Sequence, residues 1–177
     1  MQTKRKVKNM ALCGMCAAVL ILCAWISFPV GDVAITLQTF GIFLCLGVLG
    51  GKLGSLVILV YLLLGAVGVP VFSGFRGGLG ALLGASGGYL TGFLACGLVY
   101  WLITSLLPKG QIVGLVIGLL TCYCIGSLWY YKFYLTAGGS GTLGIILLQN
   151  LLFLPADLLK LILARYLTKR ILQKLSP

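Results

Sequence analysis

The sequence predicts an all-α integral membrane protein, folded as a bundle of six transmembrane helices with both termini in the cytoplasm. Three observations support this fold class: the composition, the spacing of the charged residues and the placement of the basic residues. Of the 177 residues, 60% are apolar and 8% are charged, whereas about 25% of the residues in a soluble domain are charged. The mean hydropathy is +1.15. These values exclude a soluble enzyme, a soluble nucleic-acid-binding domain and a disordered chain, because so apolar a chain could not be covered by polar groups in water.

The charged residues leave long uncharged gaps between them. From Lys8 to Asp157 there are six gaps of 19 to 32 residues, and a membrane-spanning helix needs about 20 mostly apolar residues. The gaps occupy almost the whole chain, so we expect residues 1–177 to form a single membrane domain. The expected helices cover residues 9–28, 39–50, 53–68, 87–107, 111–133 and 143–172. The second of these is short for a full span.

The basic residues predict the topology. They cluster at both ends of the chain, as Lys4, Arg5, Lys6 and Lys8, and as Arg165, Lys169, Arg170 and Lys174. Basic residues favour the cytoplasmic side, and six spans place both ends on one side. We therefore expect a multi-pass protein of a cell membrane, of bacterial type, with cytoplasmic termini. The net charge of +11 then reflects topology and contact with anionic lipid headgroups, and no nucleic-acid partner is expected.

Residues 69–86 form an unusual loop on the outer side. The segment contains five glycines between Gly74 and Gly84 and a single charged residue, Arg76. An apolar loop of this length suggests a lid or re-entrant segment over a cavity. The alternative is a loop at the level of the headgroups, anchored by Phe72 and Phe75. The sequence leaves both open.

Asp157 and Lys160 are the only pair of opposite charges within an expected span. Their spacing of three places them on one helix face, and Asn150 lies two turns earlier on a similar face. Each charge costs about 2.5–3.5 kcal/mol or more at the bilayer centre. The pair is either a salt bridge that joins helices or a recognition site. For recognition, the aspartate would accept N–H groups and the lysine would donate to a carbonyl or carboxylate.

Two weaker features have both a structural and a functional interpretation. Ala11, Gly14 and Ala18 give the first helix a small-residue face, which allows another helix to approach closely. This face suits either packing inside the bundle or docking of a partner protein. Tyr89 opens the fourth expected helix after two glycines. It suits either the wall of a ligand pocket or an aromatic anchor at the membrane interface.

The motifs and residue types that the sequence lacks argue against several classes of function. No glycine-rich stretch matches the phosphate-binding P-loop, so we do not expect this chain to hydrolyse ATP itself. It has no histidine and only two acidic residues, which argues against an enzyme, a metal site or a resident cofactor. The seven cysteines all lie in apolar runs and are expected to be packing residues.

Four motifs, taken together and in order, resemble one family. They are Thr36-Leu-Gln-Thr-Phe40, Gly65-Ala-Val-Gly-Val-Pro-Val-Phe-Ser-Gly74, Gly84-Ala-Ser-Gly-Gly-Tyr-Leu-Thr-Gly-Phe93 and Pro155-Ala-Asp-Leu-Leu-Lys160. The sequence is thereby similar to the BioY family, the biotin-specific substrate-binding components of energy-coupling factor vitamin transporters. The resemblance covers essentially the whole chain. Two departures are Ala85-Ser86, where the family usually has Pro-Thr, and Met15, where it usually has alanine.

The resemblance implies a function and partners. It implies a six-helix bundle that binds biotin near the outer face, and that topples in the membrane to release the vitamin inside. The partners it implies are a transmembrane coupling protein and two ATP-hydrolysing subunits, with the docking face at Ala11, Gly14 and Ala18. The alternative is a stand-alone small-molecule channel or transporter that works without ATPase partners. A third hypothesis is a membrane-embedded enzyme, against which the shortage of acidic residues and the lack of histidine argue.

Carried over by motif, Asp157 and Lys160 are expected to contact the ureido ring of biotin. Tyr89, Gln38 and Asn150 are further expected ligand-binding residues, Phe72 is expected beside the apolar ring, and Arg76 is a candidate for the carboxylate.

Overall fold

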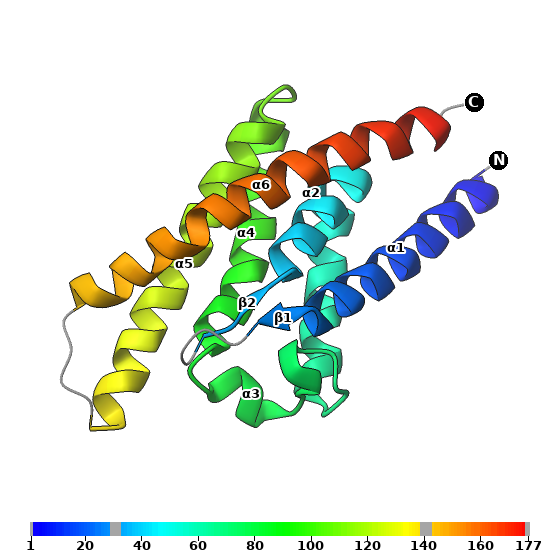
Figure 1. Cartoon of the computed structure of the whole chain (residues 1–177). Helices are drawn as coiled ribbons and strands as arrows, with labels where there is room; N and C mark the ends of the chain where they lie inside the picture. The colour runs from blue at the N-terminus through cyan, green and yellow to red at the C-terminus, as the bar shows by residue number, and fades with distance from the viewer. Residues whose placement is uncertain (1, 29–32, 139–142, 176–177) are drawn as a thin grey trace.

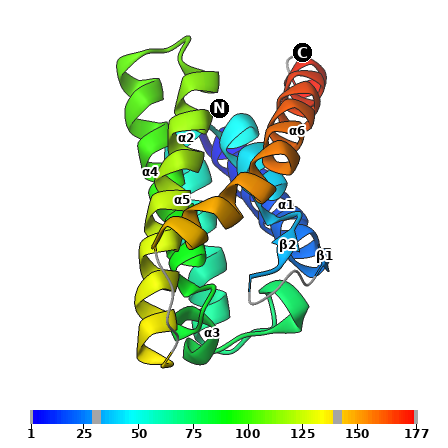
Figure 2. The same ribbon diagram turned by 60° about the vertical axis from the view of Figure 1, so that its left-hand side comes forward.

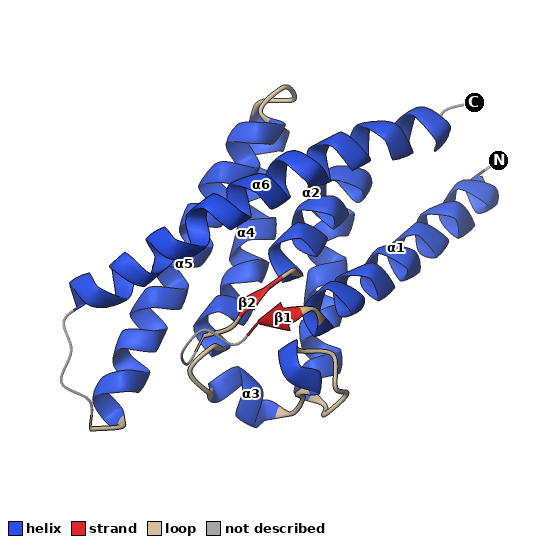
Figure 3. Cartoon of the chain, viewed as in Figure 1, coloured by secondary structure: helices blue, strands red, loops and turns tan. Residues whose placement is uncertain are grey.

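In the computed structural model, residues 2–28, 33–138 and 143–175 are described, and most of them are helical (Figures 1 and 3). The helices are α1 (Gln2–Trp25), α2 (Gln38–Ala66), α3 (Leu79–Leu83), α4 (Gly87–Leu106), α5 (Gln111–Thr136) and α6 (Leu143–Leu175). Two short strands, β1 (Ser27–Phe28) and β2 (Ile35–Thr36), pair antiparallel, with Ser27 opposite Thr36. A 3₁₀ turn covers Ser73–Phe75.

Helix α2 is two helices joined at Gly50, where φ is 76° and ψ is 173°. A Cβ atom built on Gly54 would lie 3.0 Å from the Cα atom of Leu46, so the two halves fold back against each other. Residues with a side chain rarely adopt this backbone conformation, whereas glycine adopts it readily. The halves of α2 correspond to the expected helices 39–50 and 53–68. With α1, α4, α5 and α6 they make six long helical segments in the described part of the chain, as the predicted fold requires.

Several helices extend beyond their expected ends. Helix α1 begins at Gln2 and α6 continues to Leu175, because lysine, arginine and glutamine favour helix as well as most apolar residues do. Hydropathy alone predicts only the apolar part of each helix. By length and composition alone, four described segments could cross a membrane: residues 6–25, α4, α5, and α2 counted across its reversal at Gly50. Both termini lie at the same end of the bundle (Figure 1). That this end is cytoplasmic stays a prediction from the basic residues.

Close contacts at glycines hold α4 against α5. A Cβ atom on Gly92 would lie 2.9 Å from the Cys122 sulfur, and one on Gly118 would lie 2.8 Å from the Cys96 sulfur. Small residues let helix backbones approach in this way in membranes. The outer faces of the helices carry exposed apolar side chains, among them Leu22, Leu102, Leu128, Leu152 and Ile162. Such a surface suits lipid and would be costly in water.

Helix α6 crosses the bundle obliquely, over α5 and the first half of α2 (Figures 1 and 2). At the end of the molecule opposite the termini, residues 69–86, which include α3, form a cap below β1 and β2 (Figure 1). The indole N–H of Trp25 donates to the Pro70 carbonyl at 2.9 Å, and its ring lies 4.9 Å from that of Phe75. This end of α1 and the cap are therefore joined.

Candidate functional site

Asp157 and Lys160 form an ion pair inside the protein. The Lys160 ammonium lies 2.7 Å from Asp157 Oδ1, and the two side chains are 12% and 6% exposed, respectively. Helix α6 positions them, because residues three apart share a face. Pro155 precedes them within α6 and has no N–H to donate to the preceding turn. The salt bridge considered from the sequence is therefore present, and its setting decides whether it can also bind a ligand.

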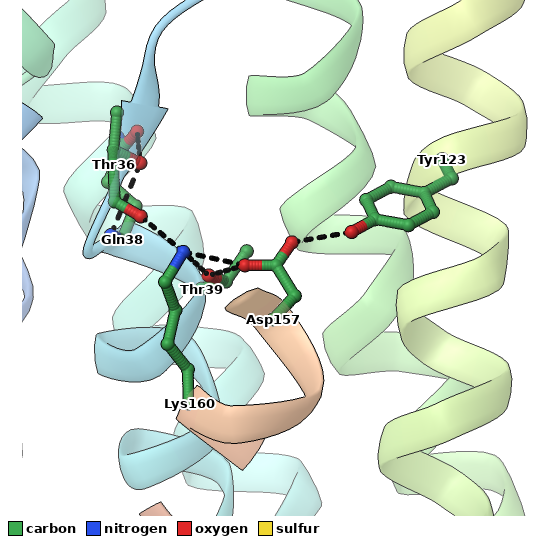
Figure 4. Close-up of polar contacts among 6 residues, drawn as sticks. All are labelled: Thr36, Gln38, Thr39, Tyr123, Asp157 and Lys160. Atoms are coloured by element: carbon green, nitrogen blue, oxygen red, sulfur yellow. Dashed lines mark hydrogen bonds and ion pairs between the residues drawn. The ribbon is translucent and has the colours of Figure 1, made fainter. Parts of the chain in front are cut away.

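Two neutral hydroxyl groups complete the surroundings of the carboxylate (Figure 4). Thr39 Oγ1, at the start of α2, donates to Asp157 Oδ1 at 2.7 Å. The Tyr123 hydroxyl, from α5, donates to Asp157 Oδ2 at 2.6 Å. Helices α2, α5 and α6 thus meet at one carboxylate. Hydrogen bonds of this kind offset part of the cost of keeping a charge away from water.

Lys160 also connects α6 to β2. Its ammonium donates to the backbone carbonyl of Thr36 at 2.7 Å and approaches Thr39 Oγ1 at 3.3 Å. With the bond to Asp157 these contacts use the three N–H donors of the ammonium. A ligand carbonyl that binds Lys160 must therefore replace one of these three contacts, and the Thr36 carbonyl is the only backbone acceptor among them.

The ion pair lies on the wall of a pocket that is partly open to the outside. Most of the wall is apolar, and the polar groups are hydroxyls, an amide and the ion pair. The lining residues are Val33, Ala34, Ile35, Thr36, Gln38, Thr39, Ser73, Ser86, Tyr89, Leu90, Phe93, Cys122, Tyr123, Phe153, Asp157 and Lys160. Such a cavity, apolar with a few convergent polar groups, is typical of small-molecule sites.

Tyr89 and Gln38 line this pocket, as a ligand-binding role requires, and each is held by a buried partner. The Tyr89 hydroxyl donates to Asn150 Oδ1 at 2.9 Å, and the Asn150 amide donates in turn to Ser127 Oγ. Gln38 Nε2 donates to the Tyr61 hydroxyl at 2.7 Å. Asn150 therefore lies behind Tyr89, and among the described residues it is not part of the pocket wall.

Phe72 and Arg76 also lie outside the described pocket wall. The Phe72 ring is 2% exposed and lies edge-on to Tyr61, with 5.4 Å between ring centroids. It fills the space beside Gly65, where a Cβ atom would lie 1.9 Å from the ring. Arg76 is exposed, and its Nε donates to the Ser73 carbonyl at 3.1 Å. Both residues shape the segment that carries Ser73 into the pocket.

Comparison with known families gives the same family as the sequence motifs do. A model of the BioY family matches residues 1–177.

The chain belongs to the BioY family.

The chain is similar to individual curated relatives and to solved structures. The protein named "Biotin transporter BioY" of Thermotoga maritima is 43% identical over 99 residues, which span 56% of this chain and 59% of that protein. The "Probable biotin transporter BioY" of Pyrococcus horikoshii is 40% identical over 130 residues, 72% of this chain and 77% of that protein. The crystal structure of an S-component for biotin from an ECF-type ABC transporter superposes with a TM-score of 0.87 at 27% identity, covering 98% of this chain and 95% of that one.

On this BioY-family chain the predicted docking residues share one exposed face of α1. Ala11, Gly14 and Ala18 are all exposed, and nothing lies within 4 Å of a Cβ atom built on Gly14. Packing inside this chain therefore does not account for the small residues at these positions.

Three residues of this BioY-family chain that contact the ion pair were not predicted from the sequence: Thr36, Thr39 and Tyr123. The two threonines flank Gln38 in the first motif, and that proximity was the available signal. Tyr123 stands alone in an apolar run with no charged residue near it in sequence. It is brought to Asp157 by the crossing of α5 and α6.

Proposed function

We propose that this chain is a membrane-embedded biotin-binding subunit for vitamin uptake, driven by an energy-coupling module that hydrolyses ATP. The observation that carries the proposal is a buried carboxylate beside a half-buried ammonium on the wall of a pocket whose other polar groups are uncharged. The printed names of the relatives in Thermotoga and Pyrococcus, and the S-component for biotin, support biotin as the ligand.

The chemistry of biotin fits this wall. Its ureido ring has two N–H donors and one carbonyl, so it can donate to Asp157 and accept from Lys160. The ion pair has no net charge, and a neutral polar ring suits it better than a ligand carboxylate, which Asp157 would repel. The apolar part of biotin suits Leu90, Phe93 and Phe153. Tyr89 and Gln38 are the further polar contacts, while Asn150 holds Tyr89.

The ATP hydrolysis that drives the proposed uptake must take place on other chains. We propose a transmembrane coupling protein and two ATP-hydrolysing subunits as partners, since the sequence has no P-loop. The exposed small-residue face of Ala11, Gly14 and Ala18 supports α1 as the docking helix, because it allows a close helix–helix approach.

Titration calorimetry of the purified protein with biotin tests the binding proposal. The parent should bind biotin, and Asp157→Ala and Lys160→Ala should each weaken binding by about tenfold or more, because each removes a charge-assisted hydrogen bond. Cys124→Ala, on the exposed face of α5, is the control and should bind as the parent does. A parent that does not bind biotin, or alanine variants that bind equally well, would contradict the proposal.

Uptake into proteoliposomes tests the energy source. Biotin uptake should require the partners and ATP inside the vesicle. Sustained uptake by this chain alone, without ATP, would instead support a stand-alone transporter.

A further inference from the structure

The hydrogen bonds around Asp157 leave an uneven set of free acceptor positions. A carboxylate offers about two acceptor positions on each oxygen. On Oδ1 both are used, by Thr39 at 2.7 Å and Lys160 at 2.7 Å. On Oδ2 the described residues supply one donor, the Tyr123 hydroxyl at 2.6 Å. The acceptor position open to a ligand N–H is therefore on Oδ2, the oxygen that also accepts the hydrogen bond from Tyr123.

Tyr123, which donates to Asp157 Oδ2, belongs to a closely packed part of α5. Its neighbour Cys122 lies against Gly92 of α4, where a Cβ atom would be 3.0 Å from the Cys122 carbonyl. One turn later, Gly126 is in close contact with the Tyr89 ring. The backbone of α5 around position 123 is thus fixed against α4, and the tyrosine side chain reaches from it across to α6 (Figure 4). The ring is also buried, at 9% exposed.

Tyr123 and Lys160 do different things for the same carboxylate. Lys160 neutralises its charge, whereas Tyr123 is a neutral donor that adds no charge. A second cation in place of Tyr123 would leave a net charge in the span, at the cost that such charges carry in a membrane. A neutral donor orients the carboxylate and leaves it available to accept another N–H.

We propose that Tyr123 is a positioning residue of the binding site: its hydroxyl sets the direction of Asp157 Oδ2, so that the free acceptor position faces the pocket and receives an N–H of the ligand's ureido ring. This inference rests on the proposed biotin-binding function. It makes Tyr123 a determinant of specificity for ligands that carry a ureido N–H, acting through Asp157.

A double-mutant cycle read by biotin titration tests this role. Tyr123→Phe keeps the ring and removes the hydroxyl, and it should weaken biotin binding about tenfold. In the Asp157→Asn background the same change should weaken binding less than about twofold, because the carboxylate it acts through is gone. Equal losses in both backgrounds, or no loss in the parent background, would overturn the inference. Tyr100→Phe, a buried tyrosine of α4 outside the described pocket wall, is the control and should leave affinity unchanged.

A second readout needs no measurable binding by the Asp157 variant. The parent should prefer biotin over a biotin methylated on a ureido nitrogen, since that analogue lacks an N–H. Tyr123→Phe should shrink this preference by about fivefold or more, whereas a tyrosine that only fills space would lower both affinities and leave the ratio unchanged. An unchanged ratio overturns the inference. Failure of the parent to bind biotin at all would instead contradict the proposed function, so the two failures can be told apart.

Discussion

The ammonium of Lys160 lies 2.7 Å from the backbone carbonyl of Thr36, which is 124 positions earlier in the chain. Because Thr36 belongs to β2 and its partner Ser27 belongs to β1, this bond connects the ion pair on α6 to the pair of strands that follows α1. The same ammonium neutralises Asp157. Lys160 therefore has two roles, one electrostatic and one as a link between distant segments, and they can be separated by mutation.

We expect Lys160→Met to destabilise the protein by about 3–5 kcal/mol, because it leaves Asp157 as an unpaired buried charge. The double variant Asp157→Asn with Lys160→Met should recover much of that loss, since no charge then remains unpaired. Both variants should lose biotin binding. Unfolding in detergent and biotin titration measure the two effects. If the double variant is as unstable as the single one, the unpaired charge is not the cause.

We expect Gly50→Ala to lower the stability by about 1–3 kcal/mol, because at φ 76° and ψ 173° the backbone of the reversal suits glycine almost alone. A Cβ atom there meets nothing within 4 Å, so the loss would come from backbone strain and not from a clash. Gly80→Ala is the matched control, since its Cβ also meets nothing and its φ is not in the left-handed range. Thermal unfolding of both variants in one detergent gives the comparison. Equal midpoints would argue against strain at Gly50.

Gly65→Ala tests the contact that Phe72 makes. The added Cβ would lie 1.9 Å from the present position of the Phe72 ring, and overpacking of this kind costs about 1–3 kcal/mol. Since Phe72 directly precedes the pocket residue Ser73, we also expect weaker biotin binding. Combining Gly65→Ala with Phe72→Leu should restore part of the stability and part of the biotin affinity, because the smaller leucine makes room for the added Cβ. A single variant as stable as the parent would show that the ring can move at no cost.

We expect Gly14→Leu to leave biotin binding by the isolated chain unchanged and to lower uptake in the complete transporter by about tenfold, the equivalent of roughly 1.4 kcal/mol lost from a helix contact. The site and the docking face are on different parts of the molecule, so binding and uptake should separate. Cys124→Leu adds bulk to the exposed face of α5 and should affect neither. Normal uptake by Gly14→Leu would exclude this face as the docking surface.

The number of long helices, their approximate places and the polar face of α6 could be read from the sequence. These features depend on short windows: a run of about 20 apolar residues needs no tertiary partner to predict a span. A spacing of three places Asp157 and Lys160 on one face whatever surrounds them. The four ordered motifs likewise indicated the BioY family. Tyr89 and Gln38, taken from those motifs, do line the pocket.

Only the tertiary structure decided which side chains surround the ion pair. Thr39 and Tyr123 are 118 and 34 positions from Asp157, and their contact depends on where α2 and α5 cross α6. Phe72, expected at the ligand, is instead packed against Tyr61, because Gly65 leaves room for its ring. Crossing points and packed volumes arise from many contacts at once, whereas hydropathy and helical spacing are properties of the chain taken a few turns at a time.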